Sequence, residues 1–159
     1  MTFSAKTEYG VRLMIELGRQ DVGEPTALKT IAAAEGLPLS YLEHVVADLK
    51  RAALVTSTRG AHGGYRLARP AAEIAMDEVV LALEGSVAPM DCLVSLPPER
   101  VACSHEGDLG RLCSTRLLWM RVQGGVLKAL HGTTLAELVE FSERQTPERQ
   151  TREPAAATA

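Results

Sequence analysis

Three cysteines are the residues of this chain whose type and spacing most directly suggest chemistry. The chain has no others, and all three lie in one segment, at Cys92, Cys103 and Cys113. Thiolate sulfur is a soft ligand that suits an iron–sulfur cluster or zinc. The segment is rich in proline and glycine, and a loop of this length in a compact domain usually has a purpose. The clustering therefore favours a metal or cluster site over three merely buried thiols.

Other kinds of cysteine chemistry fit this spacing less well. Structural zinc usually takes paired cysteines about two to four residues apart, and these cysteines are much more widely spaced, although His105 could serve as a fourth zinc ligand. A thiol oxidoreductase would usually show two cysteines separated by two residues, and that motif is absent. Three cysteines are also too few, and odd in number, for a disulfide framework.

The segment 26–69 has the order of parts of a winged helix-turn-helix. Apolar residues repeat at helical spacing before and after a turn, where Gly36 can end one helix and Pro38 can open the next. Ser40 and Glu43 have the spacing of a capping box, so we expect Ser40 to cap the second helix. A glycine-rich hairpin with β-prone arms follows. Such a protein places the second helix in a DNA major groove and the hairpin, as a wing, on the adjacent groove.

The side chains expected to contact DNA follow from this arrangement. Polar residues on the outer and N-terminal surface of the second helix would read base edges, and these are Ser40, Tyr41, Glu43 and His44. Basic residues of the wing and of the end of that helix would contact the minor groove or phosphates, and these are Arg59, Arg66, Lys50 and Arg51.

The local charge supports DNA binding. Residues 40–69 hold five Lys and Arg against two Asp and Glu, a balance of +3, whereas the whole chain has a net charge of −3. A solvated surface is the simpler explanation of such a charge run, but its coincidence with a winged-helix pattern favours DNA. The glycine-rich hairpin lacks the phosphate-loop pattern, which argues against a nucleotide-binding loop.

Helical patterns account for most of the remaining chain. We expect helices at about residues 7–19, at 74–83 with Gly85 closing the second, and at 113–132, and a last short helix begins at a capping box from Thr134 to Glu137. The long helix carries an apolar stripe formed by Leu118, Val122, Val126 and Leu130. We expect a partner surface to cover such a long exposed stripe. Two glycines in its middle cost about 2 kcal/mol relative to alanine, which close approach of a second helix would justify.

The composition, 46% hydrophobic and only 4% aromatic, suits a mostly α-helical protein with a small β-wing. We expect a winged helix-turn-helix plus a long dimerisation helix. The predicted divisions are a DNA-binding domain at 1–85, a cysteine-rich cluster-binding loop at 86–113, a dimerisation helix with a short terminal helix at 114–142, and a disordered tail at 143–159. No membrane-length apolar run and no signal-peptide pattern are present, so we expect a cytoplasmic protein with no membrane partner.

The chain resembles the IscR/NsrR family of bacterial winged-helix iron–sulfur regulators over roughly residues 1–140. The resemblance rests on S-x-L-E in the recognition helix, R-G-x-x-G-G-Y-x-L-A-R in the wing, and three cysteines before L-L-W. It implies a homodimer, not an enzyme, that binds palindromic promoter DNA under the control of an iron–sulfur cluster. By the same resemblance, Cys92, Cys103 and Cys113 match the three cysteine ligands, at spacings longer than is common in the family.

The resemblance leaves several candidates for the fourth cluster ligand. IscR-like members place a histidine where this chain has Arg116, whose guanidinium stays protonated and is a poor ligand. NsrR-like members use an acidic residue in the first helix of the other subunit, and Glu8 matches that position. Glu8 equally fits a carboxylate favoured at a helix N-terminus. Rival donors lie inside the cysteine segment, at Asp91, His105 and Asp108.

The sequence thus predicts a homodimeric DNA-binding transcriptional regulator, with repression as the expected mode. A [2Fe-2S] or [4Fe-4S] cluster would control operator binding and sense cluster or iron status, redox stress or nitric oxide. One alternative is a winged-helix regulator with structural zinc, and another is a redox or cluster-carrier protein that does not bind DNA. A carrier needs no arginine-bearing wing. The cysteine-metabolism regulators of the same family lack the cysteine set, so that branch is less favoured.

Overall fold

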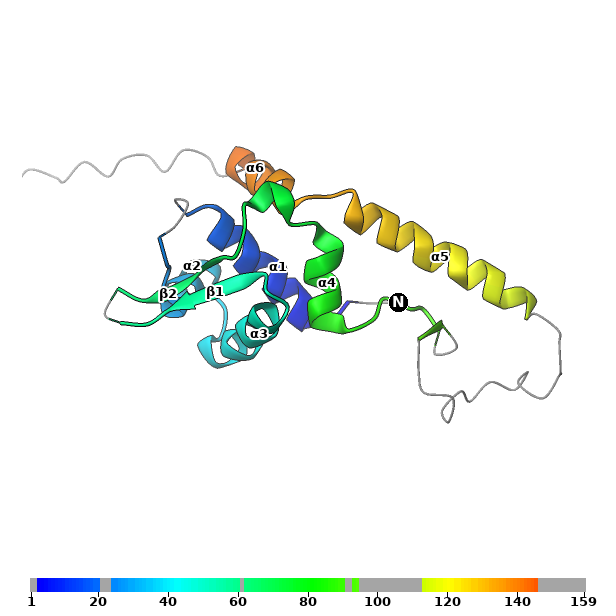
Figure 1. The fold of residues 1–159 in the computed structure, drawn as a ribbon, viewed down its shortest axis with the longest axis horizontal. Coiled ribbons are helices and arrows are strands. Elements are labelled where there is room, and N and C mark those ends of the chain that lie inside the picture. Colours follow the sequence, from blue (N-terminus) through cyan, green and yellow to red (C-terminus); the bar gives the residue numbers. More distant parts are fainter. Residues whose placement is uncertain (1–2, 21–23, 61, 91–92, 95–112, 146–159) are drawn as a thin grey trace, which may run out of the picture.

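The computed structural model describes residues 3–20, 24–60, 62–90, 93–94 and 113–145. Within them the chain is mostly helical with one two-stranded antiparallel sheet, as the sequence predicts. The elements in chain order are α1 (Ala5–Gly18), α2 (Leu28–Glu35), α3 (Leu39–Arg51), β1 (Val55–Thr58), β2 (Gly64–Leu67), the 3₁₀ turn η1 (Ala71–Glu73), α4 (Met76–Glu84), α5 (Ser114–His131) and α6 (Leu135–Gln145). Figure 1 shows a compact body from which α5 projects.

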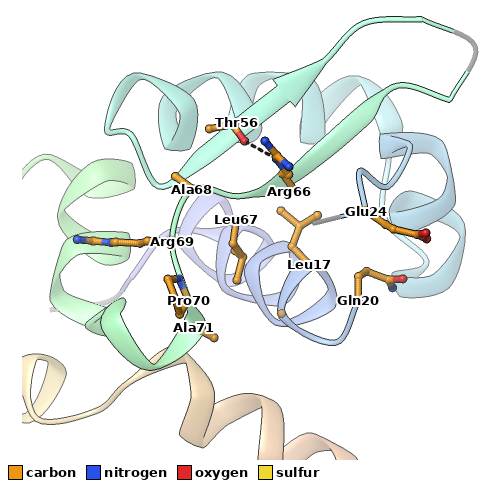
Figure 2. A pocket seen from close by; sticks show the side chains of 11 residues that line it. Leu17, Gln20, Glu24, Thr56, Arg66, Leu67, Ala68, Arg69, Pro70 and Ala71 are labelled. Atoms are coloured by element: carbon orange, nitrogen blue, oxygen red, sulfur yellow. Dashed lines mark hydrogen bonds between the residues drawn. The ribbon is translucent and has the colours of Figure 1, made fainter. Parts of the chain in front are cut away.

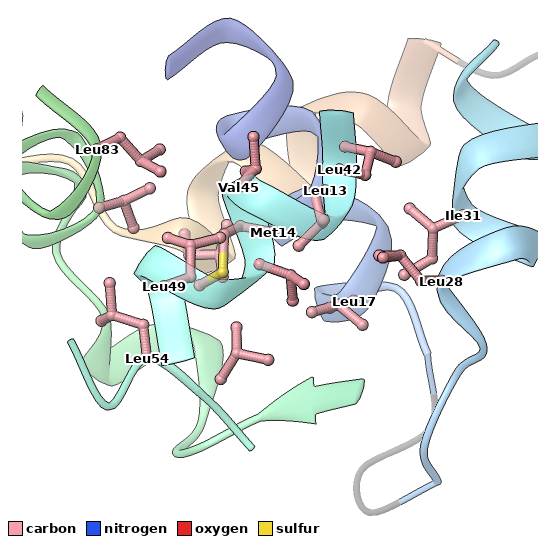
Figure 3. Close-up of a cluster of buried hydrophobic side chains, with 14 of the residues drawn as sticks. Leu13, Met14, Leu17, Leu28, Ile31, Leu42, Val45, Leu49, Leu54 and Leu83 are labelled. Carbon is pink, nitrogen blue, oxygen red and sulfur yellow. The ribbon is translucent and has the colours of Figure 1, made fainter. Parts of the chain in front are cut away.

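The core lies where α1, α2 and α3 meet α4 and the base of the hairpin. Leu13 and Met14 of α1 are fully buried, and so are Leu42 and Leu49 of α3 (Figure 3). Together with Leu17 of α1, and with Val45 and Val46 of α3, they recur at the three- and four-residue spacing of one helical face, so each helix presents a continuous apolar stripe to its neighbours. The core therefore fixes the position of α3, the helix expected to enter DNA.

The turn between α2 and α3 forms largely as expected, but the predicted cap does not. Gly36 adopts the left-handed conformation, with φ 64°, and ends α2. The expectation that Ser40 caps α3 is wrong, because α3 begins at Leu39 and its N-terminal cap is Pro38, with no side-chain cap hydrogen bond. The Pro38 carbonyl accepts the first helical hydrogen bonds, which moves Ser40 into the first turn of α3.

The wing is anchored to the segment before α2. Strand β1 pairs with β2 in the register Val55↔Leu67 to Thr58↔Gly64. In addition to this pairing, Tyr65 of β2 forms an antiparallel bridge with Thr26, with two backbone N–H···O=C bonds of 2.8 Å. A Cβ on Gly64 would lie 2.4 Å from the Thr26 carbonyl carbon, so glycine permits this close approach. The base of the wing is thereby held against the helix-turn-helix.

Helix α4 starts later than its apolar pattern suggests. The sequence predicts a helix from Ile74, whereas α4 begins at Met76. The backbone of residues 74–76 is instead paired with the segment leading into α6, because the Ile74 carbonyl accepts from Leu135 N–H at 2.9 Å and Met76 N–H donates to the Thr133 carbonyl at 2.9 Å. Gly85, with φ 76°, closes α4 as expected.

Helix α6 packs back onto α1, although its sequence position suggested a unit with the long helix. Leu135 is fully buried and Val139 nearly so. Gly18 lies so close to α6 that an added Cβ would be 2.7 Å from Val139 Cγ2. The predicted capping box is present, since Thr134 Oγ1 accepts from Glu137 N–H and Glu137 Oε2 accepts from Thr134 N–H. The helix continues to Gln145, beyond the expected boundary at 142.

Helix α5 has no buried residue in the protomer. Leu117, Leu118 and Met120 are each more than half exposed, and Cβ atoms added to Gly124 or Gly125 would meet no atom within 4 Å. Near its C-terminal end Leu130 packs against the core, and α5 contacts α4. Among the described residues, no helix is long and apolar enough to cross a membrane.

Candidate DNA-binding surface and cysteine site

The N-terminal half of α3 presents unpaired polar side chains. Ser40, Glu43 and His44 are all exposed, and none has a side-chain hydrogen bond or ion pair with another residue in the described part of the chain. The opposite face of the helix is buried through Leu42, Val45, Val46 and Leu49. A helix held by one apolar face with unpaired polar groups on the other is suited to reading base edges.

Tyr41 occupies a different environment from its three polar neighbours. Its side chain is 38% exposed, and its ring packs edge-to-face on that of Tyr9 in α1, with centroids 5.3 Å apart and planes at 80°. Such a pair contributes about 0.5–1.5 kcal/mol beyond its buried area. Tyr41 therefore joins α3 to α1 as well as lying on the surface predicted to meet DNA.

The two basic residues at the end of α3 are held by neighbouring side chains. Lys50 Nζ donates to Ser57 Oγ at 2.6 Å, which connects α3 to the first strand of the wing. Arg51 pairs with Asp48 at 2.5 Å, and its side chain is still 77% exposed. Both cations lie exposed in the last turn of α3, and their contact with phosphates stays a prediction.

Asp48 is the residue of this surface that the sequence reading missed. One carboxylate oxygen pairs with Arg51, and the other pairs with Lys6, which lies at the start of α1. The hydrogen bond from Lys6, followed by that from Arg51, holds the pKa of Asp48 below its usual range. The three-residue spacing of Asp48 and Arg51 on a helix could have revealed the nearer contact. Nothing local in the sequence reveals Lys6.

The arginines of the wing take separate positions. Arg59 is exposed near the hairpin turn. Arg66 Nε donates to Thr56 Oγ1 at 3.3 Å across the two strands (Figure 2). Arg69 turns away from the hairpin and pairs with Glu78 of α4. Thus Arg59 and Arg66 remain on the wing, and Arg69 ties the base of the wing to the helical body.

A cavity of about 390 Å³ lies at the base of the wing. Figure 2 shows Leu17 of α1 and Leu67 of β2 at its centre, with Gln20 and Glu24 along one side. Neither Cys113 nor Glu8, the two predicted cluster ligands that the structure describes, lines it. The cavity is thus lined by the C-terminal end of α1 and by the base of the wing.

Cys113 is the cysteine that the structure describes, and its surroundings favour the thiolate. It is the N-terminal cap residue of α5 and lies partly exposed. The Thr115 hydroxyl lies 3.0 Å from its sulfur, and hydrogen bonds from that hydroxyl and from the backbone of Arg116 and Thr115 lower the pKa of the thiol. A thiolate at a helix N-terminus is the form of cysteine that binds metals. Arg116 itself follows Cys113 by less than one helical turn.

Glu8 lies in the first turn of α1 and is exposed. Its carboxylate makes no hydrogen bond or ion pair with another described residue. Cys92, Cys103, Asp91, His105 and Asp108 lie outside the described residues. Within the part of one protomer that the structure covers, no group of three His, Cys, Asp or Glu side chains could hold a metal ion. Of the predicted ligands, Cys113 and Glu8 are thus the two that the structure describes, and both are accessible.

Comparison with known proteins identifies the family of this chain. The description "Rrf2: Iron-dependent Transcriptional regulator" matches residues 3–141. Protein rrf2 of Nitratidesulfovibrio vulgaris is 33% identical over 87% of each chain. The structure of CymR (YrzC), the global cysteine regulator of B. subtilis, is similar with a TM-score of 0.70 at 34% identity, covering 89% of this chain and 98% of that one. The structure of T. potens IscR gives a TM-score of 0.71 at 32% identity over 93% of each chain. The chain therefore belongs to the Rrf2 family of DNA-binding transcriptional regulators, whose members are not enzymes.

Proposed function

We propose that this regulator is a homodimer whose affinity for operator DNA is controlled by an iron–sulfur cluster. In this proposal α3 reads bases through Ser40, Glu43 and His44, with Tyr41 at the edge of the contact. Basic side chains of the helix end and wing bind the minor groove or phosphates, and these are Lys50, Arg51, Arg59 and Arg66. The observation that carries the DNA-binding assignment is the exposed, internally unpaired polar face at the start of α3.

The proposed ligands are Cys92, Cys103 and Cys113, with Glu8 as the fourth. Cys113 supports this assignment because its thiol is accessible and its pKa is lowered at the N-terminus of α5. Glu8 supports it because an exposed carboxylate without a partner among the described residues can act as a ligand without first breaking an ion pair. The bound cluster would supply a redox-sensitive cross-link between these ligands.

The dimer proposal rests on α5. Its exposed Leu117, Leu118 and Met120 form an apolar surface that a second copy would cover, and open space at Gly124 and Gly125 allows another helix to come close. Two recognition helices in such a dimer would sit about 34 Å apart, or a multiple of that distance, to meet successive major grooves. The operator is then expected to have two-fold symmetry.

A change in position of the cluster ligands can reach α3 through contacts between packed helices. Helix α5, which begins next to Cys113, packs on α4, and α4 packs on both α1 and α3. Coupling of about 1–3 kcal/mol through such contacts would change operator affinity by about 5- to 150-fold. Holding or releasing Cys113 and Glu8 would bias where α1 and α5 lie relative to the recognition helix.

A second candidate is a regulator that uses no cluster. The similarity to CymR of B. subtilis is as close in sequence as that to T. potens IscR, and CymR is described as a cysteine regulator. In this chain the thiol of Cys113 would then respond to oxidation rather than bind iron. The three grouped cysteines favour the cluster, and the colour of the purified protein separates the two candidates.

The test uses the full chain purified without oxygen, reconstituted with iron and sulfide, and examined by visible spectroscopy, metal analysis and light scattering. A duplex selected by the protein from a random pool serves as the DNA probe. We expect a brown dimeric protein, loss of the cluster with Cys113→Ala, a labile or spectrally altered cluster with Glu8→Ala, and binding weakened by about 1–3 kcal/mol with Arg59→Ala if that residue reads a base.

Several results would contradict parts of this proposal. A colourless protein with bound zinc, or with no metal, would reject the cluster. If Glu8→Ala leaves the cluster unchanged while His105→Ala perturbs it, the fourth ligand lies in the cysteine segment. Unchanged affinity of Arg59→Ala would remove that residue from the interface. A monomeric mass at micromolar concentration, with and without DNA, would reject the dimer.

A further inference from the structure

The first turn of α1 is joined directly to the recognition helix by an ion pair. Lys6 Nζ pairs with Asp48 of α3, and the same nitrogen donates to the carbonyl oxygen of Leu83 in α4 at 3.0 Å. The Lys6 and Asp48 side chains are 32% and 19% exposed, so water screens the pair less than it would screen a fully exposed one. Lys6 thus connects three helices at one point.

The Asp48 carboxylate pairs with two cations, one towards α1 and one on the exposed surface of α3. Its Oδ2 atom meets Lys6 and its Oδ1 atom meets Arg51, whose side chain is 77% exposed. Two cations therefore neutralise one carboxylate. If Lys6 withdrew, Arg51 alone would neutralise the Asp48 carboxylate, and this stronger pairing would hold the guanidinium back from DNA phosphates.

The backbone of the same turn is fixed to α4 by a second set of contacts. Glu84 Oε1 accepts hydrogen bonds from Ser4 N–H at 2.7 Å, from Ser4 Oγ at 2.7 Å and from Thr7 Oγ1 at 2.6 Å. Thr7 is buried, and Glu8 follows it immediately. Lys6, Thr7 and Glu8 thus follow one another in a single turn of α1 that these hydrogen bonds hold against α4.

From these contacts we infer that Lys6 and Asp48 are positioning residues, which transmit movement of the first turn of α1 to the phosphate-contacting end of the recognition helix. The inference rests on the proposed function for the source of the movement, the ligand Glu8. Its effect on DNA affinity rests only on the Lys6–Asp48–Arg51 contacts and can be measured on cluster-free protein. Neither residue touches DNA in this account, and both act through Arg51.

The charges of Lys6, Asp48 and Arg51 determine in which direction each substitution should change operator affinity. Removing the Lys6 charge should weaken operator binding, because Arg51 alone then neutralises Asp48 and is drawn away from the phosphates. Removing the Asp48 charge in the same protein should restore binding, because no anion remains to hold Arg51 or to repel phosphates. A purely structural role would give the opposite pattern, since the second substitution would add its own loss to the first.

The experiment is a double-mutant cycle on full-length protein without cluster, with the selected duplex as probe and fluorescence anisotropy as readout. Lys6→Gln should weaken binding by about three- to tenfold, and Lys6→Gln/Asp48→Asn should return it to within about twofold of the wild type. Arg19→Gln is the matched control, because it removes one positive charge and one partly exposed pair with Glu16 at the other end of α1. The control should leave affinity unchanged.

Either of two results on cluster-free protein would overturn the inference: Lys6→Gln binding as tightly as the wild type, or the double variant binding as weakly as Lys6→Gln or more weakly. Melting temperatures of all variants, measured alongside, must stay above the assay temperature, and Lys6→Arg, which keeps the charge, should bind as the wild type does.

A second arm tests transmission from the cluster. The ratio of operator affinities between cluster-loaded and cluster-free protein should fall towards one in Lys6→Gln if Lys6 carries the movement of Glu8. A ratio equal to that of the wild type would reject transmission through Lys6. If wild-type protein binds no cluster, the proposed function fails in that part, and the cluster-free cycle still decides whether Lys6 and Asp48 set DNA affinity.

Discussion

Replacing Gly64 by alanine should detach the wing from the helix-turn-helix. Gly64 begins β2, and the neighbouring Tyr65 makes the two backbone hydrogen bonds that join the wing to Thr26. An alanine Cβ at this position would lie 2.4 Å from both the carbonyl carbon and the carbonyl oxygen of Thr26, and 2.8 Å from the nitrogen of Ala27. All three atoms belong to backbone, so no side-chain rotation can relieve the overlap.

The expected cost follows from the contacts that must separate. Two backbone hydrogen bonds contribute about 1 kcal/mol each to stability. Backbone shifts forced by an added methyl group in a packed site cost about 1–3 kcal/mol, and the two contributions overlap because the same shift breaks the bonds. We therefore expect Gly64→Ala to lower the free energy of unfolding by about 2–4 kcal/mol. Operator affinity should fall as well, because the wing that carries Arg59 would lose its attachment to the segment before α2.

Urea unfolding followed by circular dichroism measures the first quantity, and anisotropy with the selected duplex measures the second. Thr58→Ala is a suitable control, because Thr58 pairs with Gly64 in the hairpin register and is exposed. Exposed substitutions of this kind usually change stability by less than about 0.5 kcal/mol. A Gly64→Ala protein as stable as the Thr58→Ala protein would refute the close approach of wing and Thr26.

Two further predictions concern the long helix and the first turn of α1. Gly124→Ala should favour the helix within a protomer by about 1 kcal/mol, yet weaken the dimer if a second α5 packs at that glycine; sedimentation equilibrium will decide, and an unchanged or tighter dimer contradicts close packing there. Hydrogen bonds from the Thr7 hydroxyl and from Ser4 hold the pKa of Glu84 below its usual range. A depressed pKa stabilises the fold above the unfolded-state value, so Glu84→Gln should be less stable than wild type at neutral pH. That difference should vanish as the pH falls through the folded-state pKa, and a difference that is constant with pH would assign the loss to packing instead.

Features set by local chemistry were predictable from the sequence. Gly36 and Gly85 end their helices because only a residue without a side chain adopts those positive φ values easily. The capping box from Thr134 to Glu137 needs only the four residues that form it. The hairpin follows from two β-prone arms and a glycine-rich turn. In each case the interacting groups are close in sequence.

Features set by distant pairing were not predictable. Helix α4 begins at Met76 rather than at the predicted Ile74, because the backbone carbonyl of Ile74 accepts a hydrogen bond from Leu135. No residue pattern around Ile74 indicates that distant partner. The Lys6–Asp48 pair joins two helices whose own periodicities are unaffected by it. The type and spacing of Ser40 suit a helix cap, but Pro38 takes the cap position two residues earlier and α3 begins at Leu39. The base-reading and cluster-binding residues stay predictions.

The return of α6 to the core has a consequence for how the protein is made. Leu13 and Leu17 of α1 belong to the same buried cluster as Leu135 and Val139, which the ribosome adds only after the cysteine segment. Domains generally fold as units during synthesis, N-terminal first, at about 5–20 residues per second. This core cannot be completed in that order, because α6, which contributes Leu135 and Val139, is translated last. The ribosome therefore synthesises all three cysteines before it adds the last residues of the DNA-binding core. The order of translation makes the cysteines available before that core can close.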